Sequence, residues 1–130
     1  PTGTLITMAA VLEFRWNAGT VTYDKVVVYS SGSVSSTHVI EVRGATGHGV
    51  IVTLTAASGY TIYDVSGEWI GTDGAGGNTP TVQDGFAVLR YPSGTLPGTS
   101  LTVTLYAGGT IASIAHQRLK LTVFSGRTPA

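Results

Sequence analysis

Apolar and polar side chains alternate along several short segments of the chain. The alternation is clearest in residues 11–16, 38–43, 101–107 and 118–124, where aliphatic and aromatic side chains fall mainly on one parity. Successive side chains of a β-strand point to opposite faces of a sheet, so a period of two predicts strands with one buried face. In the first of these segments the predicted buried face carries Phe14 and Trp16.

Turn-forming residues separate the segments at intervals of roughly a dozen residues, as is usual in all-β domains. Short turns rich in Gly, Asn, Asp or Ser are predicted at residues 17–19, 30–33, 58–59, 66–67, 84–85 and 108–109. Longer loops are predicted at residues 44–49, 71–80 and 92–98. No window shows the capped, amphipathic pattern of a helix.

This pattern predicts an all-β fold, a single antiparallel β-sandwich of immunoglobulin-like or jelly-roll-like type with about seven to nine strands. A length of 130 residues suits one domain that covers residues 1–130. We expect residues 1–9 to form an N-terminal arm or an edge strand. We expect residues 125–130 to form a C-terminal tail.

Composition supports a folded domain with an unusual surface. Hydrophobic residues make up 42% of the chain and charged residues 11%, although about 25% is usual for the charged fraction. A disordered chain has the opposite balance. A surface poor in charge is typical of proteins whose faces are covered by neighbours or carry Thr and Ser hydroxyls.

Charge and cysteine content argue against several classes of partner. Seven basic and seven acidic residues give a net charge of zero, whereas nucleic-acid binding needs a basic stripe. The absence of cysteine excludes a disulfide framework and a thiolate metal site. The apolar run from Leu5 to Leu12 is interrupted by Thr7, is too short for a bilayer and lacks the basic start of a signal peptide. We expect neither a nucleic-acid nor a membrane partner.

Three segments between residues 50 and 124 resemble bacterial immunoglobulin-like modules of the BACON type. They are TLTAASGYTIYDVSGEWI at residues 53–70, GTSLTVTLYAGG at residues 98–109 and RLKLTVFSG at residues 118–126. The resemblance implies a β-sandwich that serves as a glycan-associated, adhesive or virion-borne module. It also implies that the module has no catalytic residues.

The histidines do not form a recognisable catalytic or zinc pattern. His38 lies in phase with Ile40 in a predicted strand, His48 lies in the loop Gly47-His48-Gly49, and His116 lies in a predicted loop. No Gly-x-Ser-x-Gly elbow is present, and the spacing supplies no acid–base pair. The histidines also lack the close spacing of zinc ligands. The sequence therefore predicts a protein that is not an enzyme.

Calcium is the one metal that the sequence leaves open. Asp73, Asn78 and Asp84, with Asp64 or Glu68, lie in or near glycine-rich loops, and calcium prefers several oxygen ligands on flexible backbone. The spacing matches neither an EF-hand nor a repeat-type calcium loop, and Asp and Asn commonly form turns in such loops. We predict no cofactor, with calcium as the alternative.

Aromatic residues are the candidate ligand contacts. Tyr91 and Tyr106 are predicted opposite the apolar phase of their strands, and Trp69 lies beside the long loop. Aromatic planes stack on sugars and also anchor protein interfaces. With His48 and Asp73 as polar partners, these residues could form a glycan platform or an interface patch; ordinary positions on the sheet are the alternative.

The N-terminal segment and two charge pairs are the candidate features for assembly. Leu5, Ile6 and Met8 could form an arm that adds a strand to a neighbouring subunit, or they could belong to the first strand of their own sheet. The alternating pairs Glu13/Arg15 and Glu41/Arg43 are predicted on outward faces, where such charges suppress edge pairing.

Two functions follow from these observations. The first is a structural module, most plausibly a bacteriophage capsid decoration protein or a comparable surface protein, that binds a repeated protein lattice or its own copies. The second is a carbohydrate-binding or adhesive module of an exported bacterial protein. Both place the chain on a virion or at the cell surface or outside the cell.

Overall fold

The computed structural model describes residues 5–17, 19–42, 48–73, 80–81, 86–108 and 117–129, and these residues form nine β-strands. The strands are β1 (Thr7–Asn17), β2 (Thr22–Ser30), β3 (Val34–Val42), β4 (His48–Ala56), β5 (Tyr60–Asp73), β6 (Pro80–Thr81), β7 (Phe86–Gly94), β8 (Ser100–Gly108) and β9 (Gln117–Arg127). No helix among the described residues is long and apolar enough to cross a membrane.

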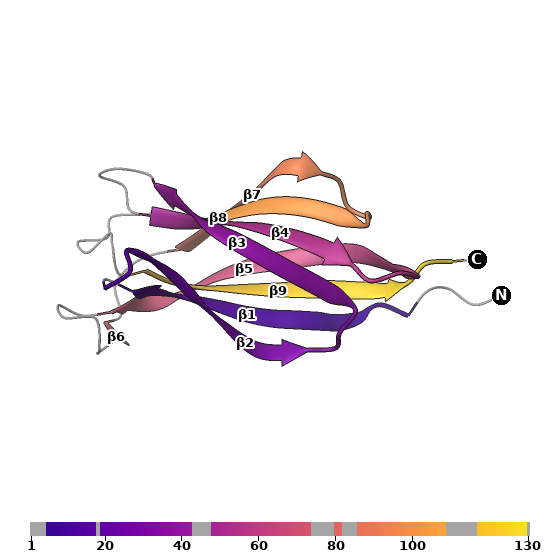
Figure 1. Ribbon diagram of the computed structural model, residues 1–130, viewed down its shortest axis with the longest axis horizontal. Coiled ribbons are helices and arrows are strands. Elements are labelled where there is room, and N and C mark those ends of the chain that lie inside the picture. The colour runs from indigo at the N-terminus through magenta and orange to yellow at the C-terminus, as the bar shows by residue number, and fades with distance from the viewer. Residues whose placement is uncertain are drawn as a thin grey trace.

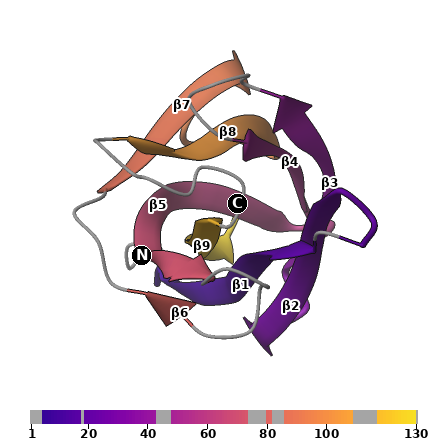
Figure 2. The ribbon, with the colours of Figure 1, turned by 90° about the vertical axis from the view of Figure 1, so that its left-hand side faces the viewer.

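The strands form two antiparallel sheets that pack face to face (Figure 1). The first sheet has the order β2-β1-β9-β5-β6, and the second has the order β3-β4-β8-β7. Seen from one end, the two sheets curve around a common interior, and β2 and β3 lie side by side at one margin (Figure 2). The predicted all-β sandwich is confirmed.

The core forms mainly from alternate residues of β1, β4, β8 and β9, as period-two alternation predicts. Phe14 and Trp16 on β1 are buried, as predicted. Fully buried Leu, Ile and Val side chains come from both sheets: Leu119, Leu121 and Val123 from β9, Ile62 from β5, Val50, Val52 and Leu54 from β4, and Leu101, Val103 and Leu105 from β8.

The predicted turn at Ser66-Gly67 is wrong, because β5 continues through both residues. Gly67 lies opposite Leu121 and faces the core, where a Cβ atom would lie 2.5 Å from Cδ1 of Leu105. The absence of a side chain therefore permits a close approach between the two sheets.

The first and last strands reach further toward the two ends of the chain than the sequence predicted. β1 begins at Thr7 and lies between β2 and β9, so residues 7–9 belong to an interior strand and not to an arm or an edge. β9 extends to Arg127, and Ser125 is buried with its hydroxyl 2.8 Å from that of Ser33. The prediction that residues 125–130 form a tail is therefore wrong for its first half.

Two further expectations need correction. The backbone of His48 pairs with Val42 at the start of β4, so His48 does not lie in a loop. Arg15 donates to Glu13 at 2.8 Å, but β1 has a strand on either side and this ion pair protects no edge. Arg43 of the other predicted pair, Glu41/Arg43, lies outside the described residues.

Pro92 lies inside the edge strand β7, beside the irregularity between Arg90 and Ser93.

Candidate functional site

The sandwich has an open seam where the edge strands β2 and β3 meet, and side chains close part of it. The amine of Lys25 on β2 donates to the backbone carbonyl and to the hydroxyl of Ser36 on β3, each at 3.0 Å. Nε2 of His38 on β3 lies 2.9 Å from the backbone carbonyl of Tyr23 on β2. The ring of His38 also packs edge-on against Phe14, with the centroids 5.2 Å apart. The side chains of Lys25 and His38 thus join the two edge strands without backbone pairing between them, and we call these contacts the latch.

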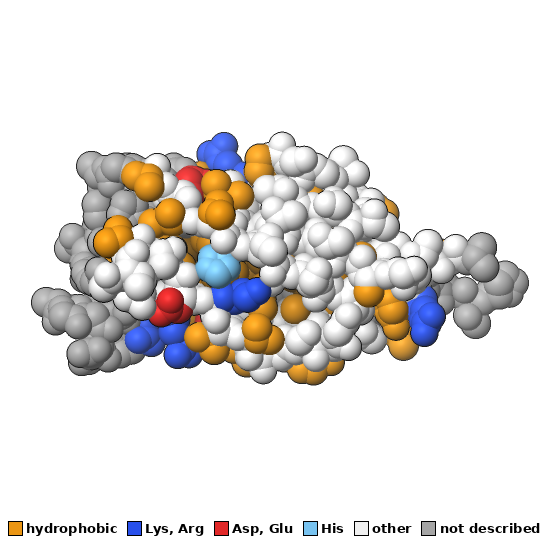
Figure 3. Space-filling view, viewed as in Figure 1, with side chains coloured by type: hydrophobic (Ala, Val, Ile, Leu, Met, Phe, Trp, Pro, Cys, Tyr) orange, Lys and Arg blue, Asp and Glu red, His pale blue; other side chains and the backbone are white. Residues whose placement is uncertain are grey.

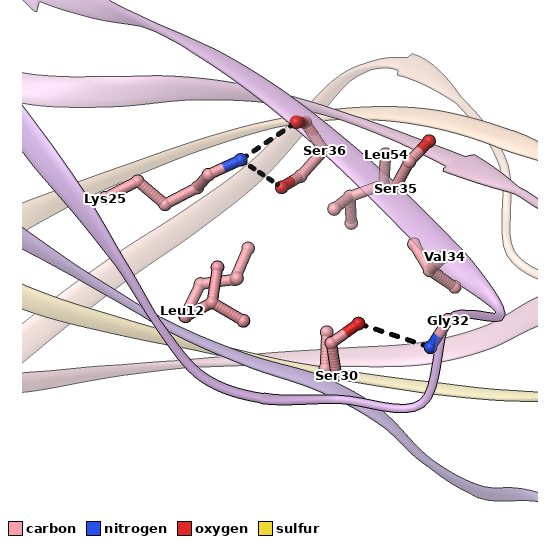
Figure 4. A pocket seen from close by; sticks show the side chains of 10 residues that line it. Leu12, Lys25, Ser30, Gly32, Val34, Ser35, Ser36 and Leu54 are labelled. Carbon is pink, nitrogen blue, oxygen red and sulfur yellow. Dashed lines mark hydrogen bonds between the residues drawn. The ribbon is translucent and has the colours of Figure 1, made fainter.

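A groove of about 380 Å³ opens along this seam beside the latch (Figure 4). Its floor is apolar and comes from both sheets, with Leu12 on β1 and Leu54 on β4. Lys25 and Ser36 lie at one side, and Ser30 at the end of β2 and Gly32 of the β2–β3 connection lie at the other (Figure 4). Leu12 and Leu54 are almost fully buried, whereas Val27 of β2, which also lines the groove, is 52% exposed.

Exposed hydrophobic side chains gather at one end of the five-stranded sheet. Six of the ten exposed large hydrophobic residues among the described residues belong to two segments, and we call these six the apolar end patch: Leu5, Ile6, Met8, Val27, Val28 and Tyr29. Leu5 is 78% exposed and Val28 is 55% exposed. Hydrophobic side chains follow the lower margin over β2 and recur where the chain enters β1 (Figure 3).

The two segments of the patch lie at the same end of the antiparallel pair β1–β2, whose register ends at Ala10 and Ser30. Tyr29 pairs with Val11, and the amide of Ser31 donates to the carbonyl of Ala9 at 2.8 Å. Val28 has no partner on β1, because the register shifts between Val11 and Leu12. β2 is the outermost strand of its sheet, so this bulge lies on an edge that the described residues leave unpaired.

A second groove, of about 590 Å³, lies on the outer face of the four-stranded sheet, and we call it the outer-face groove. It brings together Tyr91 and Tyr106, both of which the sequence singled out. Its lining residues come from β3, β7 and β8: Glu41, Arg90, Tyr91, Pro92, Thr104 and Tyr106.

Tyr106 forms the base of this groove and is less exposed than its outward position predicts. Nε of Arg90 donates to the hydroxyl of Tyr106 at 2.8 Å, and Tyr106 is only 7% exposed. Gly49 lies beside Tyr106 in the ladder, and a Cβ atom there would lie 2.7 Å from Cβ of Tyr106. Glycine at position 49 therefore lets Tyr106 pack down on the sheet.

Tyr91 is the exposed aromatic residue of the outer-face groove, at 47%. Partial burial, with a smaller contribution from the negative charge of Asp64, raises the pKa of Tyr91 above its ordinary value. The phenol therefore stays protonated through the neutral range and can both donate and accept a hydrogen bond.

The remaining candidate residues do not join this groove. Trp69 is half-buried, packs against the core and does not line the outer-face groove. The side chains of His48 and Asp73 are not described, and Asn78 and Asp84 lie outside the described residues. Within the described part of the chain, no group of three His, Asp or Glu side chains could hold a metal ion.

Sequence reasoning missed Lys25 and His38 as a pair and Arg90 as a groove residue. Both the latch and the groove join residues that are distant in the chain, and they depend on which strands are neighbours. Alternation gives the face on which a residue lies, but it does not give the neighbouring strand.

Comparison with known proteins supports the fold. No family model matches the chain, and no curated protein matches it. Among solved structures, the chain resembles envelope protein VP37 from White Spot Syndrome Virus, with a TM-score of 0.51 and 12% sequence identity. The match covers 98% of this chain and 100% of the viral chain. At this identity the likeness concerns the β-sandwich fold alone.

Proposed function

We propose that this protein is a structural subunit of a virion or a comparable surface assembly, and that it contacts a second copy of itself through the apolar end patch. In its narrower form, the proposal is a decoration protein of a phage capsid, carried by a repeated lattice. The observation that carries the proposal is the concentration of six exposed hydrophobic residues at one end of the sheet.

The chemistry of the patch favours a partner of the same kind. None of its six residues is charged, so it is complementary to another apolar surface. The chain has a net charge of zero, and two copies therefore approach without long-range repulsion. Burial of exposed Val, Leu and Tyr side chains supplies the driving force, at roughly 25 cal/mol for each Å² removed from water.

The structural neighbour adds independent support for the virion setting. VP37 is a viral envelope protein, and this chain shares its fold over nearly its whole length. A fold hosts many functions, so this support concerns plausibility and does not identify a partner.

Sedimentation velocity over a range of concentrations tests the proposal. We expect the wild-type chain to form oligomers reversibly as its concentration rises, and Val28→Lys to raise the dissociation constant at least tenfold. A lysine amine in the contact would lose its hydration without gaining a partner. The matched control is Val39→Lys, which makes the same change at an exposed position on β3, outside the patch. A chain that stays monomeric at high concentration, or variants that weaken association equally, would overturn the proposal.

A further inference from the structure

We propose that the outer-face groove binds a neutral saccharide. This site lies on the four-stranded sheet, whereas the apolar end patch belongs to the other sheet, so the inference does not depend on the assembly contact. Its volume of about 590 Å³ falls within the range of about 300–1,000 Å³ that is usual for small-molecule sites.

The apolar wall of the groove suits the carbon-bearing face of a sugar ring. Tyr91 presents a half-exposed aromatic ring, and Pro92 follows it on the same strand. Aromatic side chains bind weakly polar C–H groups against their ring faces and also carry a hydroxyl for a polar contact. Tyr91 and Pro92 thus provide a platform with a polar tip.

Arg90 provides fixed hydrogen-bond donors beside this platform. Its Nε donates to Tyr106, which holds the guanidinium in place. Among the described residues, the two η nitrogens of Arg90 have no hydrogen-bond partner. A guanidinium held in this way can donate two parallel hydrogen bonds to neighbouring hydroxyl groups.

The opposite lining of the groove supplies acceptors. The carboxylate of Glu41 accepts hydrogen bonds, and the hydroxyl of Thr104 both donates and accepts. Sugar hydroxyls are donors and acceptors at once, so a lining with one guanidinium, one carboxylate and the three hydroxyl groups of Tyr91, Thr104 and Tyr106 matches them. Arg90 and Glu41 carry opposite charges, so the lining has no net charge that would favour a charged sugar over a neutral one.

Isothermal titration with cellohexaose, maltohexaose, mannohexaose and chitohexaose tests the inference, with a sialylated oligosaccharide as the acidic comparison. We expect at least one neutral hexasaccharide to bind, and Tyr91→Ala to weaken that binding at least tenfold. We expect Thr104→Val, which removes a hydroxyl with little change in volume, to weaken it about threefold to tenfold, equivalent to one lost hydrogen bond. Tyr29→Ala, an aromatic truncation in the apolar end patch, should leave the affinity unchanged.

Three outcomes would overturn the inference: no binding of any neutral hexasaccharide, binding of the sialylated probe alone, or binding that is insensitive to both groove variants. If Tyr91→Ala does not fold, saccharide binding is tested with Thr104→Val and with Tyr91→Leu, which keeps apolar bulk without the aromatic ring. Sedimentation of Tyr91→Ala should match that of the wild type. The failure of the saccharide site is therefore distinguishable from the failure of the assembly contact.

Discussion

Glycine residues either turn the chain or let packed elements approach closely, and the sequence alone indicates only the first role. Gly49 and Gly67 both lie within β-strands, where a Cβ atom would meet Tyr106 of the paired strand and Leu105 of the facing sheet, respectively. A Ser-Gly pair is a good turn signal, and for that reason residues 66–67 were predicted to turn. The competing reason for glycine, close approach between packed elements, has no local signature in the chain.

Replacement of Gly67 tests this account of close approach. Gly67→Ala should lower the free energy of unfolding by about 1–3 kcal/mol, because the new methyl group must displace the fully buried Leu105. Chemical denaturation measures the change. Ser66→Ala, one position away on an exposed site, should change stability by less than about 0.5 kcal/mol. Equal effects of the two variants would contradict the account.

The buried phenol of Tyr23 should limit the stability of the folded protein at alkaline pH. Burial raises the pKa of Tyr23 far above its ordinary value of 10.0, so the folded chain keeps the phenolic proton longer than the unfolded chain does. The stabilisation is complete below pH 10.0 and is lost as the pH rises further. The free energy of unfolding should therefore fall steeply above that pH in the wild type and less steeply in Tyr23→Phe. Parallel pH profiles would count against this role.

At the scale of elements, the alternation of apolar and polar residues predicted the strands well. It predicted less well which face of the sheet each side chain occupies, because β-bulges interrupt the period of two. β5 has register shifts between Ile62 and Asp64 and between Trp69 and Gly71, so a fixed period of two fails along its length. Tyr91 was predicted opposite the apolar phase of its strand, yet Ala87 and Leu89, on its own parity, pack against the core. Tyr91 nevertheless lines the outer-face groove together with Tyr106, and it lies at the irregularity between Arg90 and Ser93.

The seam between β2 and β3 is the element-scale feature most open to test. Lys25→Met keeps the aliphatic stem but removes both bonds to Ser36, and should lower the free energy of unfolding by about 1–3 kcal/mol. It should also speed amide hydrogen exchange in β2 and β3 more than in β9.

Lys120→Met is the matched control for the latch. Lys120 lies on the interior strand β9, and the described residues give its amine no hydrogen bond. Lys120 lies opposite Glu13 and Glu68 on its two neighbouring strands, so this variant should lower the free energy of unfolding by less than about 1 kcal/mol. Faster exchange throughout the molecule in Lys25→Met, with no preference for β2 and β3, would contradict a local latch.

At the scale of the whole molecule, the sandwich could be predicted and the strand order could not. Alternation shows that each strand has one apolar face. These faces are buried when two sheets pack against each other, so the pattern predicts two layers. It contains no information on which strands pair, so it left open that β1 and β9 lie together in the middle of one sheet. For the same reason the outer-face groove, which joins β3, β7 and β8, was visible only as separate aromatic residues.

The central claim is that the apolar end patch is the contact through which this protein assembles. Amide hydrogen exchange, compared between dilute and concentrated samples of the full chain, tests it most directly. We predict that protection at high concentration appears in residues 5–8 and 26–30 and is absent from residues 86–94. Protection confined to residues 86–94, or no change at any position while oligomers form, would contradict the claim.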